Sequence, residues 1–216
     1  MRDLLAATSN PHKLDELRAI FSPLGFRVLS LADVGPPGGG SFPEPVEDGE
    51  TFEANASKKA VAYARMTGRP CLADDSGLVV DALGGEPGVH SAYWAGVGSN
   101  RAERDAANNK KLIEALRDVP RHERAARFVC VMALARPDAG SRDGARVLAT
   151  TRGEFEGRIT DRPRGSNGFG YDPLLEFEDG RTSAELSEAE KNARSHRGRA
   201  ARAMAQTLTG HPEWLK

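Results

Sequence analysis

The stretch Leu72-Ala73-Asp74-Asp75-Ser76-Gly77 places two adjacent carboxylates directly after a short apolar run. We interpret the run as a buried strand and expect Asp74 and Asp75 to lie at its end, before a small turn. Carboxylates in such a position suit a hard cation with oxygen ligands, above all Mg²⁺. A carboxylate-bound metal is a common means of holding a phosphorylated substrate and activating water. The alternative is purely structural, because Asp-Asp-Ser-Gly is also favourable turn chemistry.

A second candidate segment, Thr8-Ser9-Asn10-Pro11-His12-Lys13, links an apolar run at Leu4 and Leu5 to a predicted helix. Asn10 is a good N-cap and Pro11 suits the first helical position. Helix N-termini favour anions, and Lys13 adds a positive charge there. The sequence lacks the glycines of a Walker loop, so an ordinary capped helix with a solvated lysine is the structural alternative.

A third segment runs from Glu47 into a helix with Thr51 as its predicted N-cap. Asn55 and Lys59 are four residues apart and therefore share one helix face. The functional interpretation makes Glu47 a metal ligand and Lys59 a phosphate contact. The structural alternative is a solvated surface helix whose acidic residues match its dipole.

Glycines and aromatic residues alternate between Arg164 and Pro173, which predicts a loop whose backbone can approach a ligand closely. Phe169 and Tyr171 are suited to stacking on a base. The glycine spacing does not match G-x-G-x-x-G, so a dinucleotide fingerprint is not supported. Ser187 and Glu190 then form a predicted capping box for a helix that bears Lys191, followed by Ser195-His196-Arg197-Gly198. The structural alternative for this last piece is a basic, solvated helix end.

Taken in order, these motifs resemble one family closely, that of the inosine triphosphate pyrophosphatases, or Ham1-like enzymes. The resemblance runs from Leu4 to about Leu208, and five motifs in the same order are far more specific than any one of them. They are Thr8-x-Asn10-x-x-Lys13, Gly49-x-Thr51-Phe52-x-x-Asn55-Ala56, Ala73-Asp74-Asp75-Ser76-Gly77-Leu78, Gly168-Phe169-Gly170-Tyr171-Asp172-Pro173 and Ser195-His196-Arg197-Gly198.

Two positions depart from the family pattern. Many relatives have Ser-Ala-Arg after a Pro-Gly turn, whereas this chain has Ser91-Ala92-Tyr93. Any salt bridge or substrate contact of that arginine is therefore not carried over. Relatives place an acidic ligand two or three residues before Gly49, where this chain has Glu47 and Val46, so we assign the ligand to Glu47.

The alternation of strands and helices predicts an α/β class. The resemblance supplies the remainder: a long mixed central sheet flanked by helices, two lobes with the active-site cleft between them, and a homodimer. Residues 1–216 would then form a single catalytic domain of two lobes.

The resemblance implies a Mg²⁺-dependent hydrolase that converts ITP, dITP and XTP to monophosphates and pyrophosphate and so cleans the nucleotide pool. Water would attack the α-phosphorus with Asp75 as the catalytic proton acceptor, although the residues alone leave Asp74 and Asp75 as alternatives. Asp75 and Glu47 would bind the metal, with Asp74 assisting through water. The implied substrate-binding residues are Thr8, Ser9, Asn10, Pro11, His12, Lys13, Lys59, Ser76, Phe169, Gly170, Tyr171, Asp172, Lys191, His196 and Arg197.

Composition agrees with this interpretation. The chain has 216 residues, with 30 Lys and Arg against 31 Asp and Glu, and this near-neutral charge argues against bulk nucleic-acid binding. Cys71 and Cys130 are predicted to be buried free thiols. No long apolar segment or signal-like N-terminus is present, so we expect no membrane contact and a cytoplasmic location. The Pro- and Gly-rich run 35–45 is predicted to be a mobile loop.

Two other function classes remain open at this point. One is a general nucleoside triphosphate pyrophosphatase of the Maf type, with a different base preference. The other is a non-enzymatic nucleotide- or RNA-binding module, suggested by the basic residues between Arg194 and Arg202.

Overall fold

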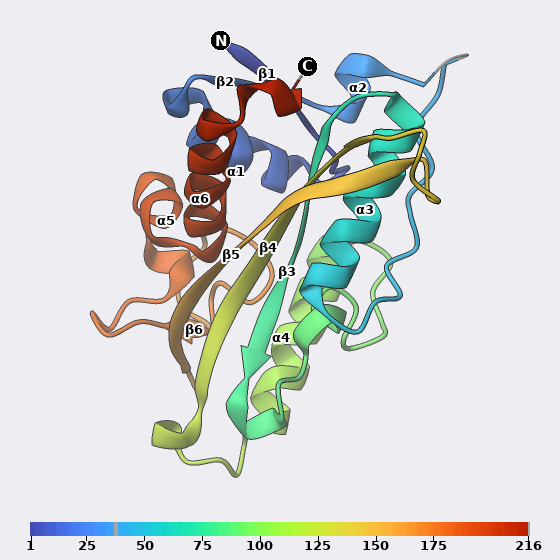
Figure 1. The fold of residues 1–216 in the computed structure, drawn as a ribbon. Helices are drawn as coiled ribbons and strands as arrows, with labels where there is room; N and C mark the ends of the chain where they lie inside the picture. The colour runs from blue at the N-terminus through green and yellow to red at the C-terminus, as the bar shows by residue number, and fades with distance from the viewer. Residues whose placement is uncertain (37–38, 216) are drawn as a thin grey trace. The chain divides into compact units, whose positions relative to one another are not determined.

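The computed structural model describes residues 1–36 and 39–215, which form an α/β fold (Figure 1). Within these residues six strands form one sheet in the order β2-β1-β3-β4-β5-β6. β1 pairs in parallel with both β2 and β3, and β5 pairs antiparallel with β6, so the predicted mixed sheet is confirmed. The strands are β1 (Arg2–Ala6), β2 (Phe26–Leu29), β3 (Cys71–Val80), β4 (Ala125–Pro137), β5 (Ala145–Ile159) and β6 (Leu175–Glu176).

Helices α1 to α4 alternate with strands β1 to β4 along the chain, as expected for the α/β class, and α5 and α6 follow β6. They are α1 (Pro11–Phe21), α2 (Leu31–Val34), α3 (Phe52–Thr67), α4 (Arg101–Ala115), α5 (Glu188–Arg194) and α6 (His196–Gly210). No helix in the described part of the chain is long and apolar enough to cross a membrane.

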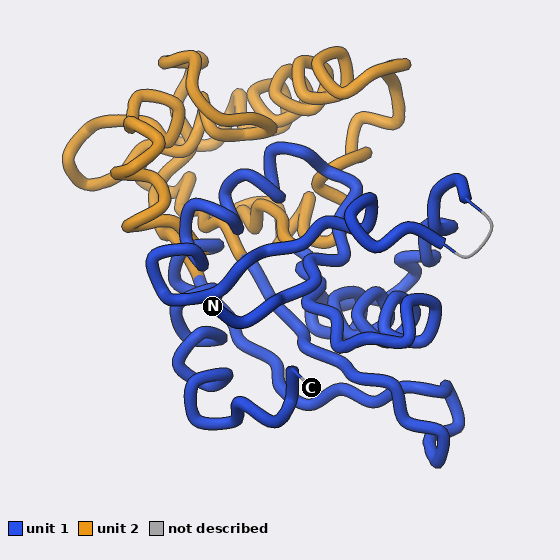
Figure 2. Tube along the Cα trace, turned by 90° about the horizontal axis from the view of Figure 1, so that it is seen from above, with its two compact units in different colours: residues 1–75, 130–153, 197–216 blue, residues 76–129, 154–196 orange. Residues whose placement is uncertain are grey.

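The chain divides into two compact units, coloured separately in Figure 2. Unit 1 comprises residues 1–75, 130–153 and 197–216, and unit 2 comprises residues 76–129 and 154–196. The strands β3, β4 and β5 each contribute residues to both units. The assignment of the whole chain to a single catalytic domain stays a prediction.

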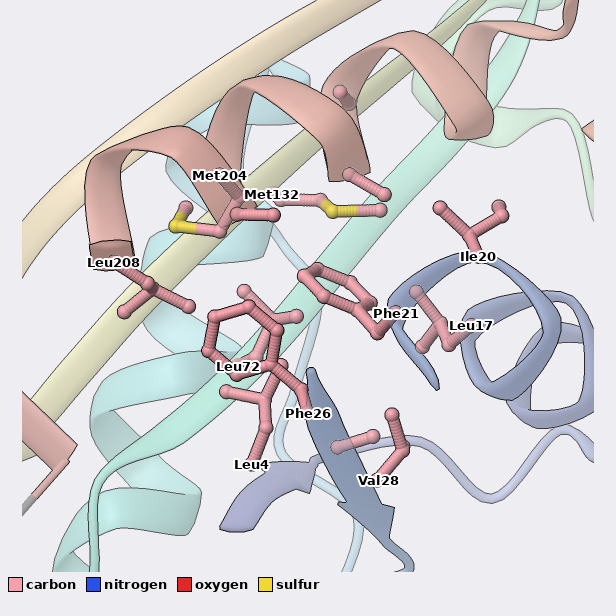
Figure 3. Packing of buried hydrophobic residues seen from close by; sticks show 14 of the residues in the cluster. Leu4, Leu17, Ile20, Phe21, Phe26, Val28, Leu72, Met132, Met204 and Leu208 are labelled. Carbon is pink, nitrogen blue, oxygen red and sulfur yellow. The ribbon is translucent and has the colours of Figure 1, made fainter. Parts of the chain in front are cut away.

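The core of unit 1 joins two helices to the first four strands of the sequence (Figure 3). Leu17, Ile20 and Phe21 project from α1, and Met204 and Leu208 project from α6, into one cluster with strand side chains. The helical spacing of these residues is the reason that one face of each helix is apolar.

The core of unit 2 is a second cluster. It is built from the unit 2 residues of β3 to β6, from α4 and from the segments that follow β5 and β6. It is formed by Leu78, Val80, Leu112, Leu116, Ala126, Phe128, Phe155, Ile159, Tyr171, Leu174, Leu175, Phe177 and Leu186. Phe155 and Phe177 stack at a centroid distance of 3.8 Å. Leu112 and Leu116 are buried as their helical spacing predicts, and Ile113 packs against the cluster while partly exposed.

The helix caps predicted from the sequence are confirmed. Asn10 accepts hydrogen bonds from the backbone N–H groups of His12 and Lys13, and Thr51 accepts one from Ala54. Ser187 and Glu190 form the predicted capping box of α5. The buried state of Cys71 and Cys130 is also confirmed.

One local prediction is wrong. Asp74 and Asp75 do not lie at a strand end before a turn, because β3 continues through both of them to Val80. In the predicted loop 35–45, residues 37 and 38 lie outside the described part of the chain, and residues 39–45 form neither helix nor strand.

Candidate active site

The adjacent carboxylates of β3 face different surroundings in unit 1. Consecutive residues of a strand point to opposite faces of the sheet, so the Asp74 and Asp75 carboxylates have different hydrogen-bond partners, although the charges of Lys13 and Lys59 act on both. Both are nevertheless buried, with 3% and 7% of their surface exposed. Burying two carboxylates is costly unless each has hydrogen-bond or ionic partners, and these partners come from distant parts of the sequence.

The Asp74 carboxylate is surrounded by cationic groups. Its Oδ2 lies 3.0 Å from Lys13 Nζ and 3.2 Å from Arg197 NH2. The Cys130 thiol lies 3.8 Å from the same oxygen. Arg197 is almost fully buried and also forms an ion pair with Glu16 through NH1. Asp74 is therefore a member of a buried charge network that ties β3 to α1 and α6.

The Asp75 carboxylate faces α3. Its Oδ2 accepts a hydrogen bond of 3.1 Å from Asn55 Nδ2. The Asn55 side chain also bonds both backbone groups of Gly49, at 2.7 Å from Gly49 N and 3.3 Å from Gly49 O. A Cβ at Gly49 would lie 2.6 Å from Asn55 Oδ1, so only glycine allows this approach. Asn55 thus links Asp75 to the segment that carries Glu47.

Lys59 lies between the acidic groups of this segment and those of β3. Its Nζ is 2.9 Å from Glu47 Oε1 and donates to the backbone carbonyl of Asp74 at 3.1 Å. The predicted placement of Asn55 and Lys59 on one face of the helix is consistent with these contacts. The Glu47 side chain is 41% exposed, so this carboxylate remains accessible to solvent.

The segment Thr8–Lys13 forms the entry to α1, as predicted. Asn10 N donates to Thr8 Oγ1 at 3.2 Å, and Ser9 Oγ bonds the Glu44 carboxylate. Lys13 lies in the first turn of α1, and its ammonium group contacts the Asp74 carboxylate. The first turn of this helix contains no acidic residue. A positive helix end and a lysine therefore lie on the Asp74 side of β3.

The surroundings shift the pKa values of the two carboxyl groups in opposite directions. Burial alone would raise the pKa of Asp74, but the charges of Lys13, Arg197 and Lys59 outweigh it and hold this pKa well below its ordinary value. At Asp75, burial wins over the opposing influence of the lysines, and the pKa is raised. Nearby charge from Glu47 adds to this rise. The surroundings therefore favour the anionic form of Asp74 and make Asp75 the better proton acceptor.

The donor set on the Asp75 side fits a hard divalent cation. Glu47 and Asp75 supply carboxylate oxygens, and a cation would relieve the repulsion from Glu47 that adds to the rise of the Asp75 pKa caused mainly by burial. The described residues contain no group of three or more His, Cys, Asp or Glu side chains that could hold a metal. Two carboxylates are nonetheless the usual protein contribution to Mg²⁺, which takes its other ligands from phosphates and water.

In unit 2, the loop around Phe169 is held by the buried ion pair of Asp172 and Lys191. Asp172 Oδ2 accepts from Lys191 Nζ at 2.7 Å and from the Phe169 backbone N–H at 2.8 Å. Lys191 Nζ also lies 4.8 Å from the centre of the Phe169 ring. A Cβ on Gly168, which has a φ of +77°, would lie 2.0 Å from Asp172 Oδ2, so glycine is required there.

Three further predicted residues have buried positions in unit 2. The Tyr171 ring belongs to the core, and its hydroxyl donates to Ser91 O at 3.0 Å, so a ligand contact would come from its backbone. His196 stacks on Phe128 with ring centres 5.0 Å apart. Ser195, the C-cap of α5, is buried beside His196.

The departure at Tyr93 has a simple structural outcome. The Tyr93 side chain is exposed, and the Arg104 guanidinium lies over its ring at 5.1 Å. Position 93 therefore presents an exposed aromatic ring that is covered by an arginine from α4.

Several residues that complete these arrangements were not predicted. Glu16, which pairs with Arg197, lies one helical turn after Lys13, and that spacing was the available signal. In unit 2, Asp105 and Asn109 of α4 bond the backbone of Gly170. Their spacing of four residues marks a polar helix face, but nothing in the sequence relates that face to a loop about sixty residues later.

A mixed α/β sheet with lysines and carboxylates gathered in one unit is typical of α/β proteins that bind phosphorylated ligands. Comparison with known proteins is more specific: the model of the Ham1 family matches residues 4–207. The chain belongs to the Ham1 family.

Sequence relatives are similar along almost the whole chain. A dITP/XTP pyrophosphatase of Geobacter sulfurreducens is 51% identical and covers 93% of this chain and 93% of its own length. One from Anaeromyxobacter dehalogenans is 46% identical, covering 95% and 97% respectively.

Solved structures agree with the fold. A HAM1 protein from Coxiella burnetii has a TM-score of 0.79 at 38% identity, covering 97% of this chain and 100% of its own. A nucleoside-triphosphatase described as a dITP/XTP pyrophosphatase from Mycobacterium abscessus has a TM-score of 0.69 at 41% identity, covering 95% and 98% respectively.

Proposed function

We propose that this chain is a nucleoside triphosphate pyrophosphatase that hydrolyses dITP, ITP and XTP to monophosphates and pyrophosphate. Membership of the Ham1 family and the names of its relatives support this reaction over the Maf-type and non-enzymatic alternatives. The observation that carries the proposal is the difference between the two buried carboxylates. Asp74 is ion-paired with Lys13 and Arg197, which lower its pKa, whereas the buried Asp75 has a raised pKa and can accept a proton.

The phosphate chemistry is proposed for the residues of unit 1. Lys13 and Lys59 neutralise the charge of the triphosphate, which otherwise repels a nucleophile. Glu47 and Asp75 would hold a Mg²⁺ ion, whose charge polarises phosphate oxygens when it is bound. Asp75 takes the proton of the attacking water at the α-phosphorus. Asp74, whose Oδ2 is engaged by Lys13 and Arg197, would assist a bound metal only through water.

Base recognition is proposed for the Phe169 loop and for the segment Lys191–Arg197. A site that offers hydrogen-bond donors at position 6 of the purine accepts a 6-oxo base and rejects adenine, where donors would face each other unpaired. Lys191 and backbone N–H groups near His196 are such donors. Asp172 is an acceptor for the N1–H of a 6-oxo purine.

We also propose a homodimer and a cytoplasmic location. Both rest on the family resemblance and on the composition of the chain.

The first prediction concerns the products. Purified protein with Mg²⁺ and dITP should release pyrophosphate and the monophosphate in equal amounts. The measurement is ion chromatography of the products from a preparation shown to lack inorganic pyrophosphatase. Orthophosphate as the initial product, with the diphosphate beside it, would contradict the proposed reaction.

The second prediction concerns Phe169. Phe169→Ala should weaken binding of inosine and xanthosine triphosphates to a similar extent, because a stacked ring is indifferent to the substituent at position 2. Stacking of a base on an aromatic residue contributes about 1–3 kcal/mol in single-stranded nucleic-acid sites. KM values for both substrates test this, and Phe155→Leu in the core of unit 2 is a control for general loss of packing. A KM change for only one of the two substrates would argue against stacking.

A further inference from the structure

We propose that Arg101, Asp105 and Asn109, on one face of α4, form a positioning stripe that fixes the Phe169 ring and thereby sets the affinity for the purine base. The inference rests on the proposed function for the assignment of Phe169 to the base. It adds a set of residues that the family motifs do not contain. All of the residues concerned belong to unit 2.

The stripe follows from helical geometry. The three residues are spaced by four, so their side chains lie along one face of the helix. Each of them contacts the loop at Phe169 or Gly170. The Arg101 guanidinium lies 4.5 Å from the centre of the Phe169 ring. Asp105 Oδ2 accepts from Gly170 N at 2.9 Å, and Asn109 Nδ2 donates to Gly170 O at 3.0 Å.

Gly170 is the residue through which α4 controls the loop. Its φ is +64°, a conformation that side chains rarely adopt, so the turn directly after the Phe169 ring depends on glycine. Glycine also has the greatest conformational freedom to lose. Asp105 and Asn109 bond its N–H and its C=O respectively, and together they fix the peptide planes on both sides. The orientation of the preceding residue, Phe169, is fixed with them.

Arg101 acts on the ring itself. A planar guanidinium packs on an aromatic face and is attracted to it electrostatically. Arg101 Nε lies 3.7 Å from Asp105 Oδ2, so the carboxylate that holds Gly170 also orients the guanidinium. Asp105 therefore couples the Arg101 guanidinium to the backbone of Gly170.

The stripe is separable from the residues that attach α4 to the rest of unit 2. Leu112 and Leu116 pack into the core. Asn108 bonds the backbone of Ser91, Ala92 and Ala95. Changes at Arg101 or Asp105 leave these attachments in place, so they should alter the ring position more than the fold.

The test measures base affinity and phosphate affinity separately. Isothermal titration calorimetry gives the dissociation constants for inosine monophosphate and for inorganic tripolyphosphate with Mg²⁺. The variants are Arg101→Ala, Asp105→Ala and the conservative Asp105→Asn, which keeps an acceptor oxygen for Gly170. Arg104→Ala is the matched control, because it removes an arginine of the same helix that lies over a different ring, that of Tyr93. Melting temperatures are recorded for all variants.

We expect Arg101→Ala and Asp105→Ala to weaken inosine monophosphate binding about tenfold, within the range of a lost stacking contact. Asp105→Asn should recover most of that loss. Tripolyphosphate binding should stay within twofold of wild type in every variant, and Arg104→Ala should match wild type for both ligands. Unchanged inosine monophosphate binding in Arg101→Ala and Asp105→Ala, an equal loss in Arg104→Ala, or a parallel loss of tripolyphosphate binding would each overturn the inference.

The failure of the proposed function would be distinguishable from failure of this inference. Pyrophosphate release from dITP by the wild-type protein tests the function, whereas the calorimetric comparison does not require turnover. A wild-type protein that binds inosine monophosphate but hydrolyses no dITP would refute the proposed reaction and leave the stripe to be decided by the variants. A wild-type protein without measurable affinity for inosine monophosphate would overturn the inference directly.

Discussion

Asp75→Asn should lower kcat for dITP by about two to four powers of ten, because it removes both a proton acceptor and a metal charge while keeping the shape of the side chain. The asparagine can still accept the hydrogen bond from Asn55 Nδ2, so the melting temperature should change little. Steady-state kinetics at saturating Mg²⁺, together with thermal unfolding, measure the two effects.

The neighbouring residue provides the contrast. Asp74→Asn removes the anion that Lys13 and Arg197 surround, so its principal effect should be on stability and on the placement of those cations. If Asp75→Asn keeps near wild-type turnover, Asp75 is not the proton acceptor. If the losses of turnover in the two variants are equal, the different roles proposed for the two carboxylates are wrong.

Arg197→Ala should lower the free energy of unfolding by about 3 kcal/mol, because removing one partner of a buried ion pair leaves an uncompensated charge. Glu16 and Asp74 would both lose a cation, although Asp74 retains Lys13. The value is therefore at the lower end of the range for broken buried pairs. For a chain of this length it corresponds to a fall in melting temperature on the order of 10 °C.

The effect should depend on pH in a defined direction. The folded pKa of Asp74 is depressed, so its contribution to stability is present above the unfolded value and is lost as the pH falls through the folded pKa. Without Arg197 this pKa is less depressed, so the stability difference between wild type and variant should stay nearly constant down to about pH 4, the unfolded value, and narrow only below it. A difference that does not narrow as the pH is lowered below about 4 would argue against a charge effect.

Arg197→Ala also tests whether Arg197 takes part in recognition of the purine base. The family resemblance implies that Arg197 contacts the purine, and in the described contacts its NH1 and NH2 bond Glu16 and Asp74. Comparing kcat/KM for inosine and adenosine triphosphates in Arg197→Ala separates the two roles. A reduced preference for inosine indicates base reading, whereas an unchanged preference with reduced stability indicates that Arg197 serves the charge network.

Local signals in the sequence predicted the local structure well. Asn10, Thr51 and Ser187 each begin a helix as expected, because a cap depends only on residues within one turn. The composition of residues 137–144 favours a hairpin-like loop, and this segment lies between β4 and β5. The apolar spacing of α4 identified Leu112 and Leu116 as core residues.

Features that depend on distant partners were not predictable in this way. Asp74-Asp75-Ser76-Gly77 has the composition of a turn, yet it continues a strand because Lys13, Arg197 and Asn55 neutralise or bond the two carboxylates. Arg197 and Glu16 are 181 positions apart in the sequence. Which of the two carboxylates is the better proton acceptor became clear only from their different surroundings, which lower the pKa of Asp74 and raise that of Asp75.

Substrate preference tests the central claim most directly. Initial rates of pyrophosphate release from dITP and dATP should be measured in one preparation, with Mg²⁺ and over a range of substrate concentrations, to give kcat/KM for each. The two substrates differ at position 6 of the purine, where the proposed donors discriminate. We predict a kcat/KM for dITP at least about a hundredfold above that for dATP, as expected when a polar site leaves the wrong base unpaired. Equal values for dITP and dATP would contradict the proposed function.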